Sequence, residues 1–168
     1  MSEFFSRLIG ILMLRDGPQD LPADTRALTL ALTCYVAITA LSLSLSNSEG
    51  GPANPIAALA LATLLPMILA RIVLGLRGRP ARWGQTVTAL FGSSALISLL
   101  SLPLGASAGS EPGPFLVVAS LVLFFWSFAV DAHIWRHALD TSFAAGLAVA
   151  VVLFAIAMYL ITSIAGPF

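Results

Sequence analysis

Five long apolar runs restrict the folds that this chain can adopt. They cover residues of about 27–46, 55–76, 85–104, 114–137 and 141–164. A helix needs about 20 apolar residues to cross roughly 30 Å of hydrocarbon, and only helices and closed barrels satisfy all their backbone hydrogen bonds in lipid. The runs lack the alternating pattern of barrel strands. The sequence therefore predicts an all-α integral membrane protein, in which residues 27–168 form a domain of five transmembrane helices.

The basic residues lie near the N-terminus and near every second connection between the runs. All eight are arginines, and they lie before the first run, around the second connection or in the fourth. The first and third connections carry no basic residue and one acid each, Glu49 and Glu111. Because arginine-rich loops stay in the cytoplasm during insertion, we expect a cytoplasmic N-terminus and a periplasmic C-terminus. Arginine without lysine, beside abundant alanine and leucine, indicates a GC-rich bacterial gene and hence a bacterial inner-membrane protein.

The overall composition excludes several classes of function. The chain is 58% hydrophobic and 10% charged, its mean hydropathy is +0.97, and its formal net charge is zero. These values lie outside the range of soluble globular proteins, and a neutral chain without a basic stripe is not expected to bind nucleic acid. The single cysteine, Cys34, can form neither an internal disulfide nor a cysteine-based zinc site. The lipid bilayer is thus the first expected partner.

Residues 1–26 precede the first run and form a separate cytoplasmic segment. An amphipathic helix is expected at its start, with Phe4, Phe5 and Leu8 on the apolar side. The helix is too short to cross the membrane, and an early acid together with the lack of a small-residue cleavage site argues against a signal peptide. We predict an uncleaved helix in the cytoplasmic interface, followed by a turn rich in proline and glycine. A helix packed beneath the bundle is the alternative.

A group of titratable side chains follows the fourth run. If the helix continues, His133, His137 and Asp140 share one face, and two imidazoles with a carboxylate are ligands that metals accept. No fourth ligand is evident, however, and Asp140 can instead cap the next helix. Histidine and arginine at a membrane boundary are ordinary anchors. We therefore predict no metal and no cofactor, and keep a metal-dependent or lipid-modifying enzyme that uses these three residues as an alternative.

Few charges occur within the runs. Arg71 lies about five residues from the cytoplasmic end of the second run, where its side chain can snorkel to the headgroups. A buried pair with Asp131 or Asp24 is the alternative. No acid is expected at the centre of a run, which disfavours coupled transport. If the protein were an oligomeric channel, Ser94 and Ser98 of the third run would line its pore.

The arginines of the second connection, Arg77, Arg79 and Arg82, are candidates for contact with lipid phosphate or with a protein partner. Their effect on topology is by itself a sufficient explanation for them. Together with Asp16, Asp20 and the apolar face of the N-terminal helix, they form the expected cytoplasmic surface for partners.

Residues 77–160 contain a series of loose patterns: Gln85-Thr86, a small-residue stretch at 89–95, Leu102-Pro103, Trp126, a tight turn at 134–142, and Gly146. With five crossings in 168 residues, these patterns resemble the bacterial branch of the Yip family of Rab-interacting membrane proteins. The resemblance implies an all-helical membrane domain, usually non-enzymatic, that acts through partners.

These observations favour a non-enzymatic scaffold, assembly factor or accessory subunit of a larger membrane complex. The expected partners are the bilayer and either another membrane protein or further copies of the chain. The connections are too short to hold a soluble domain, and no catalytic set shares one depth in the membrane. A channel or transporter component is the first alternative function, and the enzyme described above is the second.

Overall fold

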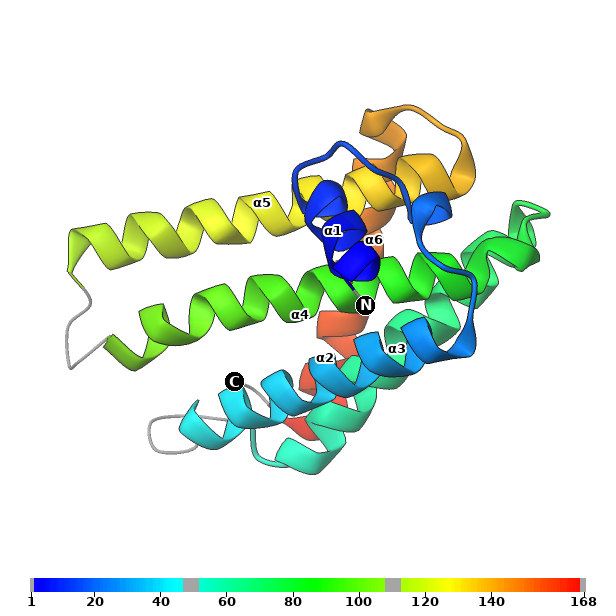
Figure 1. Ribbon diagram of the computed structural model, residues 1–168. Coiled ribbons are helices and arrows are strands. Elements are labelled where there is room, and N and C mark those ends of the chain that lie inside the picture. The colour runs from blue at the N-terminus through cyan, green and yellow to red at the C-terminus, as the bar shows by residue number, and fades with distance from the viewer. Residues whose placement is uncertain (1, 47–51, 108–112, 167–168) are drawn as a thin grey trace.

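The computed structural model describes residues 2–46, 52–107 and 113–166, and within these ranges it contains helices and no strand (Figure 1). The helices are α1 (Ser2–Leu12), α2 (Thr25–Ser46), α3 (Pro55–Leu76), α4 (Trp83–Ser107), α5 (Pro114–Leu139) and α6 (Phe143–Ala165), with two 3-10 turns, η1 (Pro18–Asp20) and η2 (Pro80–Arg82). In this part of the chain, five helices are long and apolar enough to cross a membrane. The predicted all-α membrane architecture with five spans is confirmed at this level.

Helix α4 occupies the centre of the bundle and packs against α1, α2, α3 and α5. Of its apolar window 44% is buried, against 6 to 17% for the other four spans, and its hydropathy is the lowest of the five. Buried hydroxyl groups are tolerated there because each bonds to a backbone carbonyl four residues earlier. The buried hydroxyls of Thr86, Thr88 and Ser93 donate to carbonyl oxygens one turn earlier, at 2.7 to 2.8 Å.

Helices α5 and α6 approach closely because Gly146 has no side chain. A Cβ at this position would lie 2.9 Å from the backbone nitrogen of Arg136 and closer still to the carbonyl oxygen of Ala132. A second close approach occurs at Gly92, where a Cβ would lie 2.7 Å from the Leu8 side chain.

The helix ends follow ordinary capping rules, with two departures from the sequence-based expectation. Asp24 caps α2, since its Oδ1 accepts from Ala27 N at 2.7 Å. Ser142, rather than Asp140, caps α6 by accepting from Ala145 N. Asp140 instead ends α5 in the left-handed region, with φ of 47°. Helix α4 also continues beyond Pro103 to Ser107, three residues past the predicted exit.

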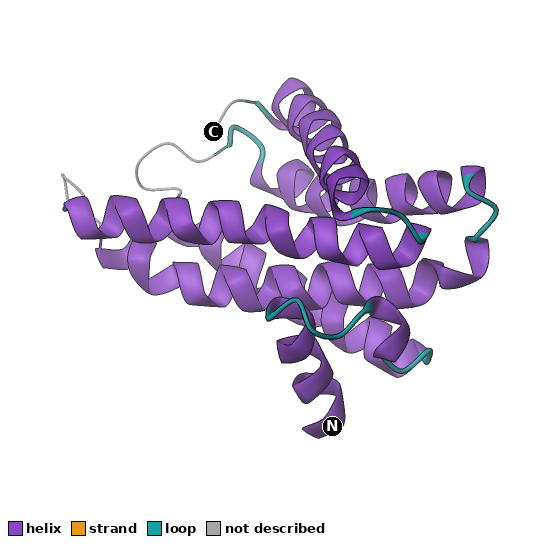
Figure 2. Ribbon diagram, turned by 90° about the horizontal axis from the view of Figure 1, so that it is seen from above, coloured by secondary structure: helices purple, strands orange, loops and turns teal. Residues whose placement is uncertain are grey.

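Helix α1 lies across the bundle rather than along it (Figure 2). Its side chains Phe4 and Leu8 are buried against the other helices, at 7% and 2% exposure, whereas Phe5 is 42% exposed. The indole nitrogen of Trp126 on α5 donates to the carbonyl oxygen of Leu12 at 3.2 Å. Of the three apolar residues of this helix that were predicted to contact lipid or a partner, two are therefore buried in the protein's own core.

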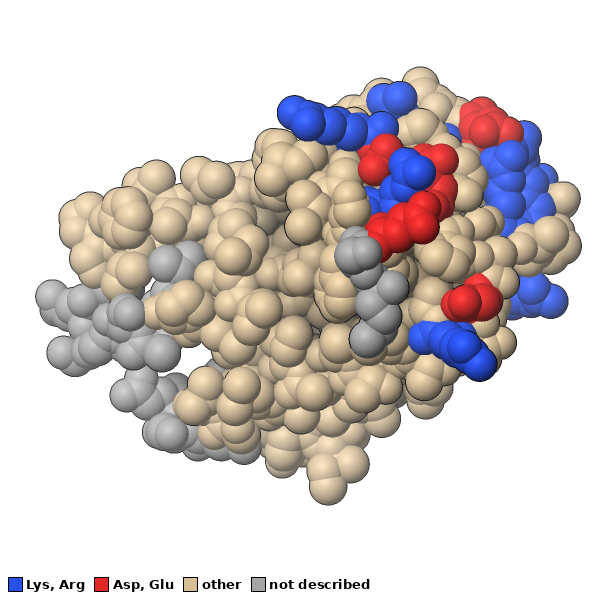
Figure 3. All heavy atoms as spheres, in the orientation of Figure 1, with Lys and Arg blue, Asp and Glu red and all other residues tan. Residues whose placement is uncertain are grey.

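Charged side chains gather over one half of the molecule, toward the α3–α4 and α5–α6 turns, on the face that Figure 3 shows. On the same face the other half is free of charge among the described residues. Glu49 and Glu111, the two acids predicted for the opposite side, lie outside the described residues.

Candidate functional site

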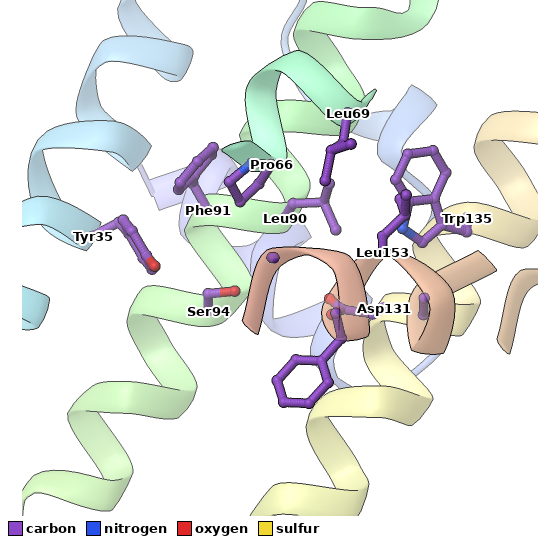
Figure 4. A pocket seen from close by; sticks show the side chains of 12 residues that line it. Tyr35, Pro66, Leu69, Leu90, Phe91, Ser94, Asp131, Trp135 and Leu153 are labelled. Atoms are coloured by element: carbon purple, nitrogen blue, oxygen red, sulfur yellow. The ribbon is translucent and has the colours of Figure 1, made fainter. Parts of the chain in front are cut away.

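A cavity of about 150 Å³ lies between the five long helices (Figure 4). Three side chains bring oxygen atoms to it from three different helices: Tyr35 from α2, Ser94 from α4 and Asp131 from α5. The rest of the wall is apolar or aromatic and consists of Pro66, Leu69, Leu90, Phe91, Trp135, Ala150, Leu153, Phe154 and Ala157.

The cavity lies between the helices, away from their ends. At a rise of about 1.5 Å per residue, Asp131 is about 12 Å from the end of α5 at Leu139. By the same measure, Tyr35 is about 15 Å from the start of α2, and Ser94 is about 16 Å from the start of α4. Tyr35 and Ser94 are therefore near the middle of α2 and α4, and Asp131 is about a third of the way along α5 from its C-terminal end.

The position of Tyr35 follows from a proline in the neighbouring helix. Pro66 has no backbone N–H, so the carbonyl oxygen of Ala62 cannot receive its usual helical hydrogen bond. The hydroxyl of Tyr35 donates to this oxygen at 3.4 Å. The Tyr35 ring also meets Phe91 of α4 edge to face, with 4.8 Å between ring centroids. These contacts hold the polar end of Tyr35 in the wall of the cavity.

Asp131 has no hydrogen-bonded or ionic partner among the side chains that the structure describes. Arg71, which the sequence offered as a partner, is exposed and donates from Nη1 to the carbonyl oxygen of Pro80 at 3.2 Å. The alternative of a buried Arg71–Asp131 pair is therefore wrong. An isolated carboxylate in a low-dielectric cavity is costly unless it is protonated or meets a cation.

Aromatic side chains complete the environment of this carboxylate. Trp135 follows Asp131 by one helical turn and is only 2% exposed, and its indole N–H has no hydrogen-bond partner among the described residues. Rings of Tyr35, Phe91 and Phe154 also line the cavity. Aromatic faces attract cations through their quadrupoles. A cavity that combines one carboxylate with four aromatic side chains in its wall suits a positively charged ligand.

This site was missed because the fourth run, 114–137, is apolar only up to Val130. Asp131 was therefore assigned to the end of the helix that emerges from the membrane. The observed α5 continues to Leu139 with Val130 and Ile134 fully buried, so Asp131 belongs to a helix that packs in the bundle on both sides of it. That no acid lies at the centre of a run stays a prediction. The uninterrupted helical pattern from 115 to 139, without proline or glycine, was the available signal.

The side chains of His133, His137 and Asp140, which were predicted to share one face, do not form a common site. The two imidazoles contact each other edge to face, with 4.6 Å between centroids, but Asp140 turns away to the arginines of the α3–α4 connection. His133 is buried, and its Nε2 lies 2.9 Å from the carbonyl oxygen of Asp16, to which it must donate. In the part of the chain that is described, no cluster of three metal-ligating side chains occurs.

Two arginines of the predicted partner surface instead hold two turns of the protein together. Arg79 and Arg82 both pair with the carboxylate of Asp140, Arg82 at 3.2 Å. Arg82 also donates to the carbonyl oxygens of His137 and Ala138 at the end of α5. Hydrogen bonds from Arg79 and then Arg82 hold the pKa of Asp140 below its ordinary value. We call these three residues the Asp140 lock.

The other predicted surface residues have varied positions. Arg77 is exposed and has no side-chain partner among the described residues. Asp16 lies 3.7 Å from Arg7, and Asp20 accepts from the backbone N–H of Gly17 at 2.8 Å. Ser98 is half-buried and does not line the cavity that Ser94 faces.

Comparisons of the chain with protein-family models, curated proteins and solved structures find no match.

Proposed function

We propose that this protein is a non-enzymatic membrane protein that binds a small organic cation in the Asp131 cavity. It acts as a transport component or as a cation-binding accessory subunit of a larger membrane complex. The observation that carries the proposal is the unpartnered Asp131 carboxylate in the wall of the cavity between the long helices, because such a group inside a span usually marks a path or a site for positive charge.

The residues that line the cavity indicate which class of ligand it can bind. Four aromatic residues beside one carboxylate favour an ammonium ion with an apolar body over a hydrated metal ion. A cavity of about 150 Å³ matches a ligand the size of a single benzene ring. Ser94 and Tyr35 supply oxygen atoms for an N–H of the cation.

Location and orientation are part of the proposal. The arginine distribution supports a bacterial inner membrane, with the α3–α4 and α5–α6 turns in the cytoplasm and the C-terminus in the periplasm. The outward stripe Phe5, Ile9 and Met13 on and just after α1, exposed by 42 to 56%, supports a helix that lies in the cytoplasmic interface. Action through partner proteins is what the resemblance to the Yip family implies, and it stays a prediction.

Equilibrium binding of labelled benzylammonium to the purified protein tests the function, with benzyl alcohol as the neutral probe of similar shape. Asp131→Asn is expected to weaken benzylammonium binding by about 10- to 100-fold, the value of a charge-assisted contact. Glu3→Gln is the matched control, since it removes an acid outside the cavity. Equal binding of the two probes, or unchanged binding in Asp131→Asn, would contradict the proposal.

Uptake of the same probe into proteoliposomes separates the two versions of this function. A transport component accumulates benzylammonium, and loses that uptake in Asp131→Asn. A cation-binding accessory subunit binds the probe without moving it.

A further inference from the structure

A groove on the outer surface of α3 and α4 combines apolar walls with one positive charge. It has a volume of about 540 Å³ and is lined by Leu64, Met67, Ile68, Arg71, Ile72 and Trp83. Three of the aliphatic residues, Leu64, Ile68 and Ile72, recur at every fourth position of α3 and are each 51 to 53% exposed. They form a continuous apolar strip about 12 Å long.

Arg71 lies at the end of this strip that is nearer to the turn between α3 and α4. A guanidinium has five N–H donors, and only one hydrogen bond is formed, from Nη1 to the carbonyl oxygen of Pro80. Arg71 has no carboxylate partner among the residues that the structure describes. Most of its hydrogen-bonding capacity is therefore open to an anion.

Trp83 lines the same groove as Arg71. Its indole nitrogen donates to the carbonyl oxygen of Met67 at 3.0 Å, which ties the ring to α3. Tryptophan and arginine together are typical of the level at which lipid headgroups meet the hydrocarbon layer.

The arginines around this turn divide into paired and unpaired groups. Arg79 and Arg82 belong to the Asp140 lock, which offsets part of their charge. Arg71 and Arg77 have no acidic partner among the described residues, and both are exposed. The unneutralised positive charge thus lies at the end of α3, next to the groove.

We propose that this groove binds an anionic phospholipid, with its phosphate at Arg71 and an acyl chain along Leu64, Ile68 and Ile72. Charge complementarity selects the headgroup, because an unpaired guanidinium at the membrane surface attracts anionic lipid. The apolar strip and the Trp83 ring contact the chain. The site is separate from the Asp131 cavity and does not depend on the function proposed for it.

Quenching of Trp83 fluorescence by brominated lipids tests this site. The Trp126→Phe variant is reconstituted in vesicles that contain equal mole fractions of brominated phosphatidylglycerol or brominated phosphatidylcholine. Trp126 is removed because it is 40% exposed, whereas Trp135 is 2% exposed and shielded from lipid. Phosphatidylglycerol is expected to compete for the site about fivefold better than phosphatidylcholine, the effect of one arginine near the surface.

Three further variants in the same background decide the outcome. Arg71→Gln should reduce the preference to about one, and Arg71→Lys should keep most of it, since the positive charge remains. Arg26→Gln, which removes an exposed arginine of α2 outside the groove, should leave the preference unchanged. Equal quenching by the two lipids with Arg71 present, or an undiminished preference in Arg71→Gln, would overturn the proposal.

Discussion

The hydroxyl of Tyr35 donates a hydrogen bond to the carbonyl oxygen of Ala62 in the adjacent helix, at 3.4 Å. This oxygen is free to accept because Pro66 removes the donor that an unbroken helix would supply. The backbone hydrogen bond that is missing in α3 thus positions a polar side chain of α2 at the cavity.

This relationship predicts a coupling between Tyr35 and Pro66. Tyr35→Phe should lower the free energy of unfolding by about 1 kcal/mol, the usual value of one hydrogen bond. In a Pro66→Ala background the same change should cost clearly less, because residue 66 then donates to Ala62 itself. Thermal unfolding of the four proteins in detergent, followed by circular dichroism, measures the coupling. Equal costs in the two backgrounds would show that the hydrogen bond does not depend on Pro66.

Gly146 should be one of the least replaceable residues in the spans. Gly146→Ala places a Cβ against the backbone of α5 at Ala132 and Arg136, and we expect a loss of about 1–3 kcal/mol, as for other overpacked sites. Gly84→Ala is the matched control in α4, since its Cβ would meet no atom within 4 Å. The control should be neutral or slightly stabilising because alanine favours helices. A similar effect of both changes on thermal unfolding would argue against close α5–α6 packing.

Leu8 should anchor α1 to the bundle. It is 2% exposed and packs on Gly92, whereas its neighbour Ile9 is 52% exposed. Leu8→Ala should therefore cost about 2–3 kcal/mol and release α1, and Ile9→Ala should cost less than about 1 kcal/mol. Trypsin cleavage after Arg15 in mild detergent reports the release. Equal cleavage rates in the two variants would contradict an anchoring role for Leu8.

The Asp140 lock should make stability depend on pH in the acidic range. The pKa of Asp140 is lowered from its ordinary value of 3.8 in the folded protein. Its contribution is therefore complete above about pH 4 and disappears as the pH falls through the folded pKa. Asp140→Asn keeps a residue that tolerates the left-handed backbone and removes the charge.

The thermal midpoint of Asp140→Asn should lie below that of the native protein at pH 7, and the difference should shrink steadily as the pH falls below about 4. It should also shrink at high salt, because the pair is exposed and screened. A difference that does not change with pH in the acidic range would assign it to some cause other than the charge.

Several local features could be predicted from residues alone. The five spans agree with the observed helices to within a few residues at each end, because helix length in lipid depends on an uninterrupted apolar run. The Asp24 cap was also predictable, because capping involves only residues within one turn. The candidate site was not, because it requires Tyr35, Ser94 and Asp131 to meet from three helices.

The sequence by itself determined the secondary structure and the number of spans. The tertiary structure alone decided which side of each helix faces protein. It buries Phe4 and Leu8 but exposes Phe5, directs Asp131 to a cavity, and joins Arg79 to Asp140 across 61 residues of sequence. The physical reason is that lipid and protein interior are both apolar. Hydrophobic periodicity, which separates the inside from the outside of a soluble protein, therefore carries little information here.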